Sequence, residues 1–336
     1  MLIPKVSIII PIYNPGKCFV KCLDSVIHQT LKEIEVICID DGSTDESMDV
    51  LKKYSNNDNR FKIFHQENQG AGSTRNNGIE KANGEYILFL DADDWIESDA
   101  CEKLYNHAKK LDVDLVLFDT IWYHGNDKKE LVKSFEDNEF NHDYNSFVFN
   151  RTSIYEKIVN PSLGVIWSKF YKTSFLKNND IKFSTYKIYN DVVFHFKTML
   201  LANKIAYFPH VFYHYIKIGH PSLQTSYRWG EYEQLWASVM TEVLEFLIEN
   251  NLMNEFKMTF LVYSLVSFEG KLRFTHNDYK ESFFLRIKHF YESLNLTGDE
   301  FKNLILWQQT FLIHVICSDN YEEFNSMSEN FNGRHF

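Results

Sequence analysis

The segment GEYILFLDADDW, residues 84–95, joins a short apolar run directly to a cluster of carboxylates. The run YILFL, residues 86–90, is continuously apolar, which is typical of a strand covered on both faces in a parallel sheet. Asp91, Asp93 and Asp94 follow at its tip. Like charges this close raise one another's proton affinity, so they stay ionised at low cost only beside a cation. The segment therefore predicts a buried strand that ends in a cation site.

Four further runs of the same kind lie nearby: VSIIIPIY (6–13), EVICID (35–40), FKIFH (61–65) and DLVLFD (114–119). Amphipathic stretches separate them, at about 16–29, 44–55, 71–82 and 98–111. Strands that alternate with helices in this way indicate βαβ units and a parallel sheet. The fold class we predict is α/β, with a Rossmann-like, doubly wound sheet.

Helical periodicity dominates the second half of the chain. NDVVFHFKTMLLANK (190–204) is predicted as one helix, followed by strand-like IAYFP and VFYHYI. From about residue 230 onward, long stretches have few breakers, and LILWQQTFLIHVI (304–316) is expected to be a helix buried by packing. We therefore predict a catalytic domain over 1–225 and a helical C-terminal region over 226–336.

Composition excludes several classes of protein. The net charge of −11 over 336 residues argues against non-specific binding to nucleic acid or to an anionic bilayer. The five cysteines are scattered, so we expect neither a disulfide framework nor a zinc knuckle. There is no signal-peptide pattern and no run of about 20 apolar residues. We expect a cytoplasmic protein.

Polar residues follow three of the predicted strands, in PIYN (11–14), DDGSTD (40–45) and DADD (91–94). The carboxyl ends of parallel strands meet at one edge of the sheet, where ligands of such folds bind. Mg²⁺ and Mn²⁺ prefer oxygen ligands and commonly combine one or two carboxylates with substrate phosphates. No Walker loop or GxGxxG is present, and NQGAGSTRNNGI (68–79) supplies glycines and one cation, Arg75. Arg75 as an ordinary solvated helix residue is the alternative.

Several motifs in order resemble glycosyltransferase family 2, the inverting nucleotide-sugar transferases of GT-A fold. They are VSIIIPIYN, QTLKEIEVICIDDGSTDES, NQGAGSTRNNGIEKANGEYILFLDADDW, WSKFYK and YNDVVFHFKTMLLANKIAYFP. The resemblance covers about residues 5–225, and the C-terminal third carries no family motif.

The resemblance implies a donor site built from the three strand ends. Asp91 and Asp93 match the outer carboxylates of the family's DxD motif and would bind Mn²⁺ or Mg²⁺, Asp93 more directly. The pair after the second strand matches Asp40 and Asp41, of which Asp41 would accept a hydrogen bond from uracil. The rest of the implied donor site is Pro11 and Tyr13 at the base, Arg75, and His214 and Lys217 in a mobile loop (213–225). A UDP-sugar is the implied donor.

The acceptor side is implied by the same resemblance. The family places a general base in an acidic dipeptide at the start of a helix, which here reads Asn190-Asp191, so Asp191 matches the base and Asn190 departs from the usual glutamate. Asp94 follows the DxD motif and is placed on the acceptor side with Trp167 and Lys169. For Trp167 a position in the core is the alternative, and for Asp191 the alternative is an ordinary helix cap.

Two other functions stay open at this point: a sugar nucleotidyltransferase and a non-catalytic nucleotide-sugar-binding module of the same fold. For a transferase, the acceptor would be a glycan or a lipid-linked glycan, in bacterial surface polysaccharide synthesis. Peripheral contact with the inner face of the membrane and a homodimer also stay open.

Overall fold

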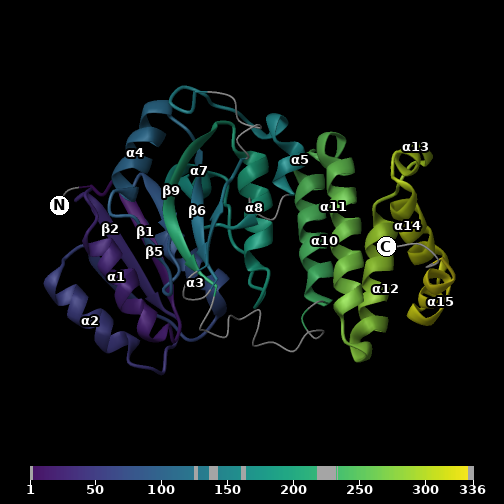
Figure 1. Ribbon diagram of the computed structural model, residues 1–336, viewed down its shortest axis with the longest axis horizontal. Coiled ribbons are helices and arrows are strands. Elements are labelled where there is room, and N and C mark those ends of the chain that lie inside the picture. Colours follow the sequence, from purple (N-terminus) through teal and green to yellow (C-terminus); the bar gives the residue numbers. More distant parts are fainter. Residues whose placement is uncertain are drawn as a thin grey trace. The chain divides into compact units, whose positions relative to one another are not determined.

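A computed structural model describes residues 3–124, 128–135, 143–159, 164–217, 232 and 234–331, the side chains of 330 and 331 excepted. The chain divides into two compact units, Met1–His220 and Pro221–Phe336. In Figure 1 the first unit runs from purple through teal to green and contains the sheet, and the second runs from green to yellow and is helical. The domain boundary predicted at 225/226 lies outside the described residues.

The first unit alternates strands and helices. Its strands are β1 (Val6–Ile12), β2 (Ile34–Asp40), β3 (Phe61–His65), β4 (Tyr86–Phe89), β5 (Trp95–Ile96), β6 (Leu115–Tyr123), β7 (Lys129–Val132), β8 (Lys169–Lys172) and β9 (Ile205–Ile216). Its helices are α1 (Phe19–Ile27), α2 (Ser47–Asn57), α3 (Gly70–Lys81), α4 (Ala100–Leu111), α5 (Tyr155–Ile158), α7 (Thr173–Asn178) and α8 (Asn190–Leu201), with 3-10 turns η1 (Gly16–Cys18) and η2 (Arg151–Ser153).

The strands of the described residues form one nine-stranded sheet in the order β3-β2-β1-β4-β8-β6-β9-β5, with β7 beside β6. β3, β2, β1 and β4 are parallel, as predicted. β8 then runs antiparallel between β4 and β6, which is a mixed pairing that the apolar runs alone do not reveal. The α/β fold class is confirmed, with a sheet that is only partly parallel.

β9 joins into one strand the two strands predicted from IAYFP and VFYHYI. Its pairing with β6 shifts register between Phe118 and Asp119 and again between Asp119 and Thr120. Such irregularities bend a strand and change the direction of its side chains. The last part of β9 thereby also pairs with β5, directly after the DADD cluster, through Trp95 and His214.

Helix α3 packs against β1 and β2. Its close approach to the neighbouring backbone requires glycine, because a Cβ at Gly72 would lie 2.3 Å from the Ser184 carbonyl oxygen and 3.0 Å from Asn190 Cβ. Real Cβ atoms essentially never come closer than 3.0 Å to such an atom. The missing side chain therefore lets α3 touch both the segment around residue 184 and the start of α8.

The second unit is helical over its described residues, which confirms the predicted helical C-terminal region. It contains α10 (Gln234–Glu249), α11 (Met253–Phe274), α12 (Asn277–Ser293), α13 (Gly298–Lys302), α14 (Leu306–Cys317) and α15 (Tyr321–Phe331). α14 buries Phe311 and Val315 but exposes Leu306 and Ile313, so the expected burial of 304–316 holds for one face only. Within the described ranges, no helix combines the length and the apolar character that crossing a membrane requires.

Candidate active site

The carboxyl ends of three neighbouring parallel strands bring the predicted donor-side residues to one edge of the sheet. β1 lies between β2 and β4, and Ile12 pairs with Asp40 where the first two strands end. Asp91 comes shortly after the end of β4. Pro11 belongs to β1 itself and Tyr13 follows it, with 51% of its surface exposed. An exposed aromatic ring at this edge is available for stacking on a flat ligand.

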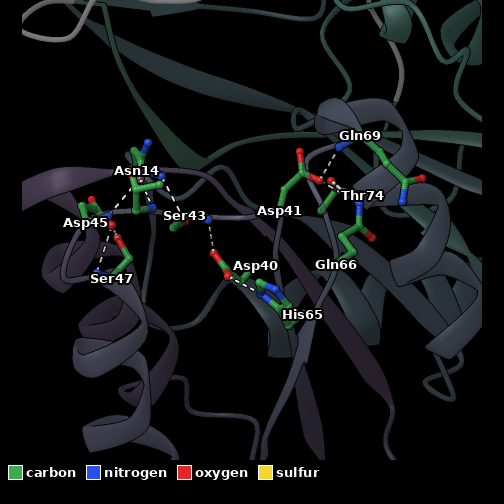
Figure 2. Close-up of polar contacts among 11 residues, drawn as sticks. Asn14, Asp40, Asp41, Ser43, Asp45, Ser47, His65, Gln66, Gln69 and Thr74 are labelled. Atoms are coloured by element: carbon green, nitrogen blue, oxygen red, sulfur yellow. Dashed lines mark hydrogen bonds and ion pairs between the residues drawn. The ribbon is translucent and has the colours of Figure 1, made fainter.

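Asp40 is fully buried, and its carboxylate organises the loop after β2 (Figure 2). One oxygen accepts a hydrogen bond from the Ser43 backbone N–H at 3.0 Å, and the other lies 2.7 Å from Nδ1 of His65. The same loop is tied to the end of β1, because Asn14 Oδ1 accepts from the Thr44 backbone N–H at 2.8 Å. These hydrogen bonds hold the loop after β2 against the end of β1.

Asp41 is also buried, and its carboxylate caps helix α3 (Figure 2). It accepts hydrogen bonds from the backbone N–H groups of Gln69 and Gly70, both at 2.8 Å, and from Gln66 Nε2 at 2.8 Å. A negative charge at a helix N-terminus is favourable, since the first N–H groups lack partners within the helix. Gly70 has a φ of +85°, which favours glycine. A carboxylate has about four positions at which it can accept a hydrogen bond, and these three donors leave Asp41 one for the predicted hydrogen bond from uracil.

The three carboxylates of the DADD cluster have different surroundings. Asp91 Oδ1 is bonded to Nη2 of Arg75 at 2.6 Å, and Asp93 is partly exposed. Asp94 is fully buried: Tyr213 Oη donates to Oδ2 at 2.7 Å and the Ile216 backbone N–H donates to Oδ1 at 2.8 Å. Burial, with the charges of the other two carboxylates, raises the pKa of Asp94 well above its usual range.

Asp94 therefore lies inside the protein, although we expected it on the acceptor side. Tyr213 carries this connection further, because its hydroxyl oxygen also accepts from the Asp91 backbone N–H at 3.2 Å. The end of β9 is thus fastened to the DADD turn, so that the outer carboxylates have a defined position. No local pattern in the sequence indicates a contact between Tyr213 and residues more than 100 positions earlier. The sequence therefore did not predict the role of Tyr213 at this site.

Arg75 connects the two halves of the site. Its side chain is buried, with Nη2 on Asp91 and Nη1 donating to Asn190 Oδ1 at 3.4 Å, while Nε has no hydrogen-bond partner among the described residues. Although burial opposes the charge, Asp91 and Asp191 raise the pKa of the guanidinium. The alternative of a solvated helix residue is therefore wrong.

Asp191 lies in the first turn of α8, partly buried. The helix is preceded by Tyr189 in the left-handed region at φ 60°, an uncommon conformation for a residue with a bulky side chain. Burial raises the pKa of Asp191 above its usual value, against the charges of Arg75 and Lys169. A carboxylate with a raised pKa in a polar site is a suitable general base.

The two predicted acceptor-side residues of the WSKFYK motif lie in the protein interior. Trp167 is 7% exposed and stacks on Tyr213 with ring centroids 4.6 Å apart, which places it in the core, the alternative position. Lys169 is fully buried on β8, and its ammonium donates to the Val165 carbonyl oxygen. Burial lowers the pKa of Lys169 to about 7, while the charge of Asp191 opposes the shift. Lys169 and Asp191 thus influence each other electrostatically.

The two basic residues predicted to reach a diphosphate have different positions. His214 is 6% exposed, with Nε2 at 2.7 Å from Glu97 Oε1 and Nδ1 at 3.1 Å from Tyr123 Oη, and it stacks on Trp95. His214 therefore links strands in this structure. Lys217 is exposed, and the rest of the predicted mobile loop, 218–225, lies outside the described residues.

Asp91 and Asp93 are the candidates for a metal ion. In the parts of the chain that the structure describes, no group of three or more histidine, cysteine, aspartate or glutamate residues could hold one. Two carboxylate residues fit a hard cation that completes its coordination with substrate phosphates and water. The residues present therefore fit Mg²⁺ or Mn²⁺ only as an ion shared with the substrate.

Comparison with known proteins identifies the family of this chain. The model of the family described as Glycosyl transferase family 2 matches residues 7–182. EpsH of Bacillus subtilis, named as a glycosyltransferase, is 33% identical over 269 residues, 77% of this chain and 74% of that protein. Glycosyltransferase GlyG of Streptococcus pneumoniae is 27% identical over 320 residues, 87% of this chain and 98% of that protein.

Among solved structures, S. aureus TarS 1–349 in complex with UDP has a TM-score of 0.76 and 20% identity, covering 99% of this chain and 93% of that one. The same TarS fragment in complex with UDP-GlcNAc has a TM-score of 0.75 and 21% identity, with the same coverage. At these identities the likeness shows the fold, which is of GT-A type, and leaves the function to be argued from the site.

Proposed function

The chain belongs to glycosyl transferase family 2 and is a glycosyltransferase, and on this premise we propose an inverting, metal-assisted transfer from a UDP-sugar to a hydroxyl of a glycan or lipid-linked glycan. In this proposal Asp191 is the general base, and Asp93 and Asp91 hold Mn²⁺ or Mg²⁺. Family membership favours this activity over a sugar nucleotidyltransferase and over a binding module without activity.

The observation that carries the proposal is the position of Arg75. Its guanidinium bonds Asp91 on one side and Asn190, the neighbour of Asp191, on the other. A guanidinium is only a few ångströms wide, so the strand-tip carboxylate and the candidate base occupy one site although 100 positions separate them in the sequence. A displacement with inversion needs the two groups in one site, because the base takes the proton of the hydroxyl that attacks the anomeric carbon from the face opposite the leaving diphosphate.

The chemistry follows as a single displacement. The acceptor hydroxyl oxygen forms a bond to the anomeric carbon while the bond from that carbon to the β-phosphate oxygen breaks. The hydroxyl proton goes to the Asp191 carboxylate, and UDP leaves with the electron pair of the broken bond. A bound divalent ion would neutralise charge on the leaving diphosphate. The buried cation Arg75 adds fixed positive charge at the same place.

Two kinds of similarity support the donor and acceptor classes. TarS has been solved in complex with UDP and with UDP-GlcNAc, and in this chain exposed Tyr13 lies beside the buried pair Asp40 and Asp41, a suitable arrangement for a nucleobase. A poly(ribitol-phosphate) beta-glucosyltransferase of Bacillus spizizenii is 33% identical over 226 residues, 63% of this chain and 32% of that protein. We therefore propose bacterial surface polymers as acceptors. Action at the cytoplasmic face of a membrane and a homodimer belong to the same proposal.

The decisive test is Asp191→Asn, which keeps the size of the side chain and removes the base. We expect UDP release from UDP-GlcNAc or UDP-glucose with an acceptor polymer and Mn²⁺ to fall by about 10²–10⁴-fold. UDP affinity, measured by calorimetry, should stay within about twofold, because Asp191 does not touch the nucleotide in this proposal. Full turnover in the variant would refute the assignment of the base.

A further inference from the structure

Asn190, which stands where the family usually has glutamate, uses both ends of its side-chain amide. Oδ1 accepts from Nη1 of Arg75 at 3.4 Å, and Nδ2 donates to the Tyr186 carbonyl oxygen, also at 3.4 Å. A carboxylate at this position could accept from Arg75 but could not donate to the carbonyl. The amide therefore matches its two partners in a way that the acidic residue would not.

The backbone of Asn190 is held as firmly as its side chain. Its carbonyl oxygen accepts from the Ser184 N–H at 3.2 Å, and the missing side chain of Gly72 lets α3 pack against its Cβ. The preceding residue, Tyr189, has its backbone in the left-handed region. Asn190 is only 7% exposed. The amide is thus confined between α3 and the segment that precedes α8, and it has little freedom to turn away from Arg75.

The charges around Arg75 explain why a neutral side chain at position 190 suits this site. Arg75 is buried and forms an ion pair with Asp91, and the negative charge of Asp191 also raises the pKa of its guanidinium. A second carboxylate at position 190 would compete for the guanidinium and would place a negative charge next to the base. The neutral amide fixes the direction of the guanidinium by a hydrogen bond and does not neutralise its positive charge.

We propose that Asn190 is a positioning residue. It holds the guanidinium of Arg75 against Asp91, and it keeps Asp191 in place at the start of α8. The inference rests on the proposed function, because it assigns Asn190 a role toward the base and the strand-tip carboxylate of that site. It explains how this chain can carry an amide where an acid is usual and retain the site.

The test compares Asn190→Ala and Asn190→Asp with the wild-type chain, using UDP release with an acceptor polymer and Mn²⁺. Asn190→Ala removes both hydrogen bonds of the side-chain amide. We expect kcat to fall about tenfold, with the donor KM within about twofold of the wild-type value. Asn190→Asp adds a charge beside Asp191, which raises the pKa of the base. Because only the ionised base accepts a proton, the acid limb of the kcat profile should then move to higher pH.

Controls separate positioning from folding and from failure of the proposed function. Asn179→Ala is the matched control, since that amide donates to the Phe175 carbonyl oxygen within its own helix end at 2.8 Å. Melting temperatures are measured for all variants. Wild-type kcat in Asn190→Ala, or an unmoved acid limb in Asn190→Asp, would overturn the inference. If one of these two results is found while Asp191→Asn is inactive, only the inference about Asn190 fails. If Asp191→Asn is active, the proposed base is refuted, and the inference about Asn190 fails with it.

Discussion

Replacing Gly72 by alanine tests whether the contact between α3 and α8 controls the active site. The new Cβ would lie 2.3 Å from the Ser184 carbonyl oxygen, whereas ordinary contacts begin at 3.4 Å, so the neighbouring backbone must move by about 1 Å. Overpacking of this kind costs about 1–3 kcal/mol of the free energy of unfolding. The higher helix propensity of alanine offsets this cost by about 1 kcal/mol.

We expect Gly72→Ala to lower kcat strongly while changing the free energy of unfolding only a little. The displaced groups include Asn190, which directly precedes Asp191, and a misplacement of about 1 Å can cost about 10²-fold in rate. We therefore expect kcat of Gly72→Ala to fall by about that factor, with UDP affinity little changed. UDP release gives the rate, and urea unfolding gives the stability.

The chain supplies a matched control in Gly270 of α11, where an added Cβ would meet no described atom within 4 Å. Gly270→Ala should stabilise its helix by about 0.5–1 kcal/mol and leave kcat unchanged. Equal kcat values for Gly72→Ala, Gly270→Ala and wild type would show that the packing of α3 on α8 does not position Asp191, the proposed base.

Three further outcomes are expected. Asp93→Ala should weaken UDP-sugar binding in the presence of Mn²⁺ but not in its absence, and calorimetry that finds equal affinities with the ion present would count against the metal role. Tyr213→Phe leaves buried Asp94 without one donor and should cost about 1–3 kcal/mol by urea unfolding, so an unchanged midpoint would contradict the structural role of that hydroxyl. Because burial raises the pKa of Asp191, the acid limb of the wild-type kcat profile should lie above pH about 4, the value for a free aspartate, and a limb at or below it would show an unperturbed base.

The strand tips show how far local patterns reach. Each predicted strand from VSIIIPIY to YILFL is confirmed to within a residue or two, because an apolar run and the helix after it are encoded within about 30 residues. Parallel strands end at the same edge, so the proximity of the segments after β1, β2 and β4 followed from the sequence alone. The sequence likewise determined that acidic residues gather there.

The tertiary structure alone decided what each of those residues touches. Arg75 meets Asn190 across 115 positions, and Tyr213 meets Asp94 across 119. Neither pairing leaves a periodic signal, since each depends on how β8 and β9 enter the sheet and on how closely α3 packs. The same packing buried His214 and turned it toward the exposed Glu97, whereas the family resemblance implied a position at the diphosphate. Composition and periodicity report burial and element type, whereas the direction of a side chain is set by the packing of segments far apart in the chain.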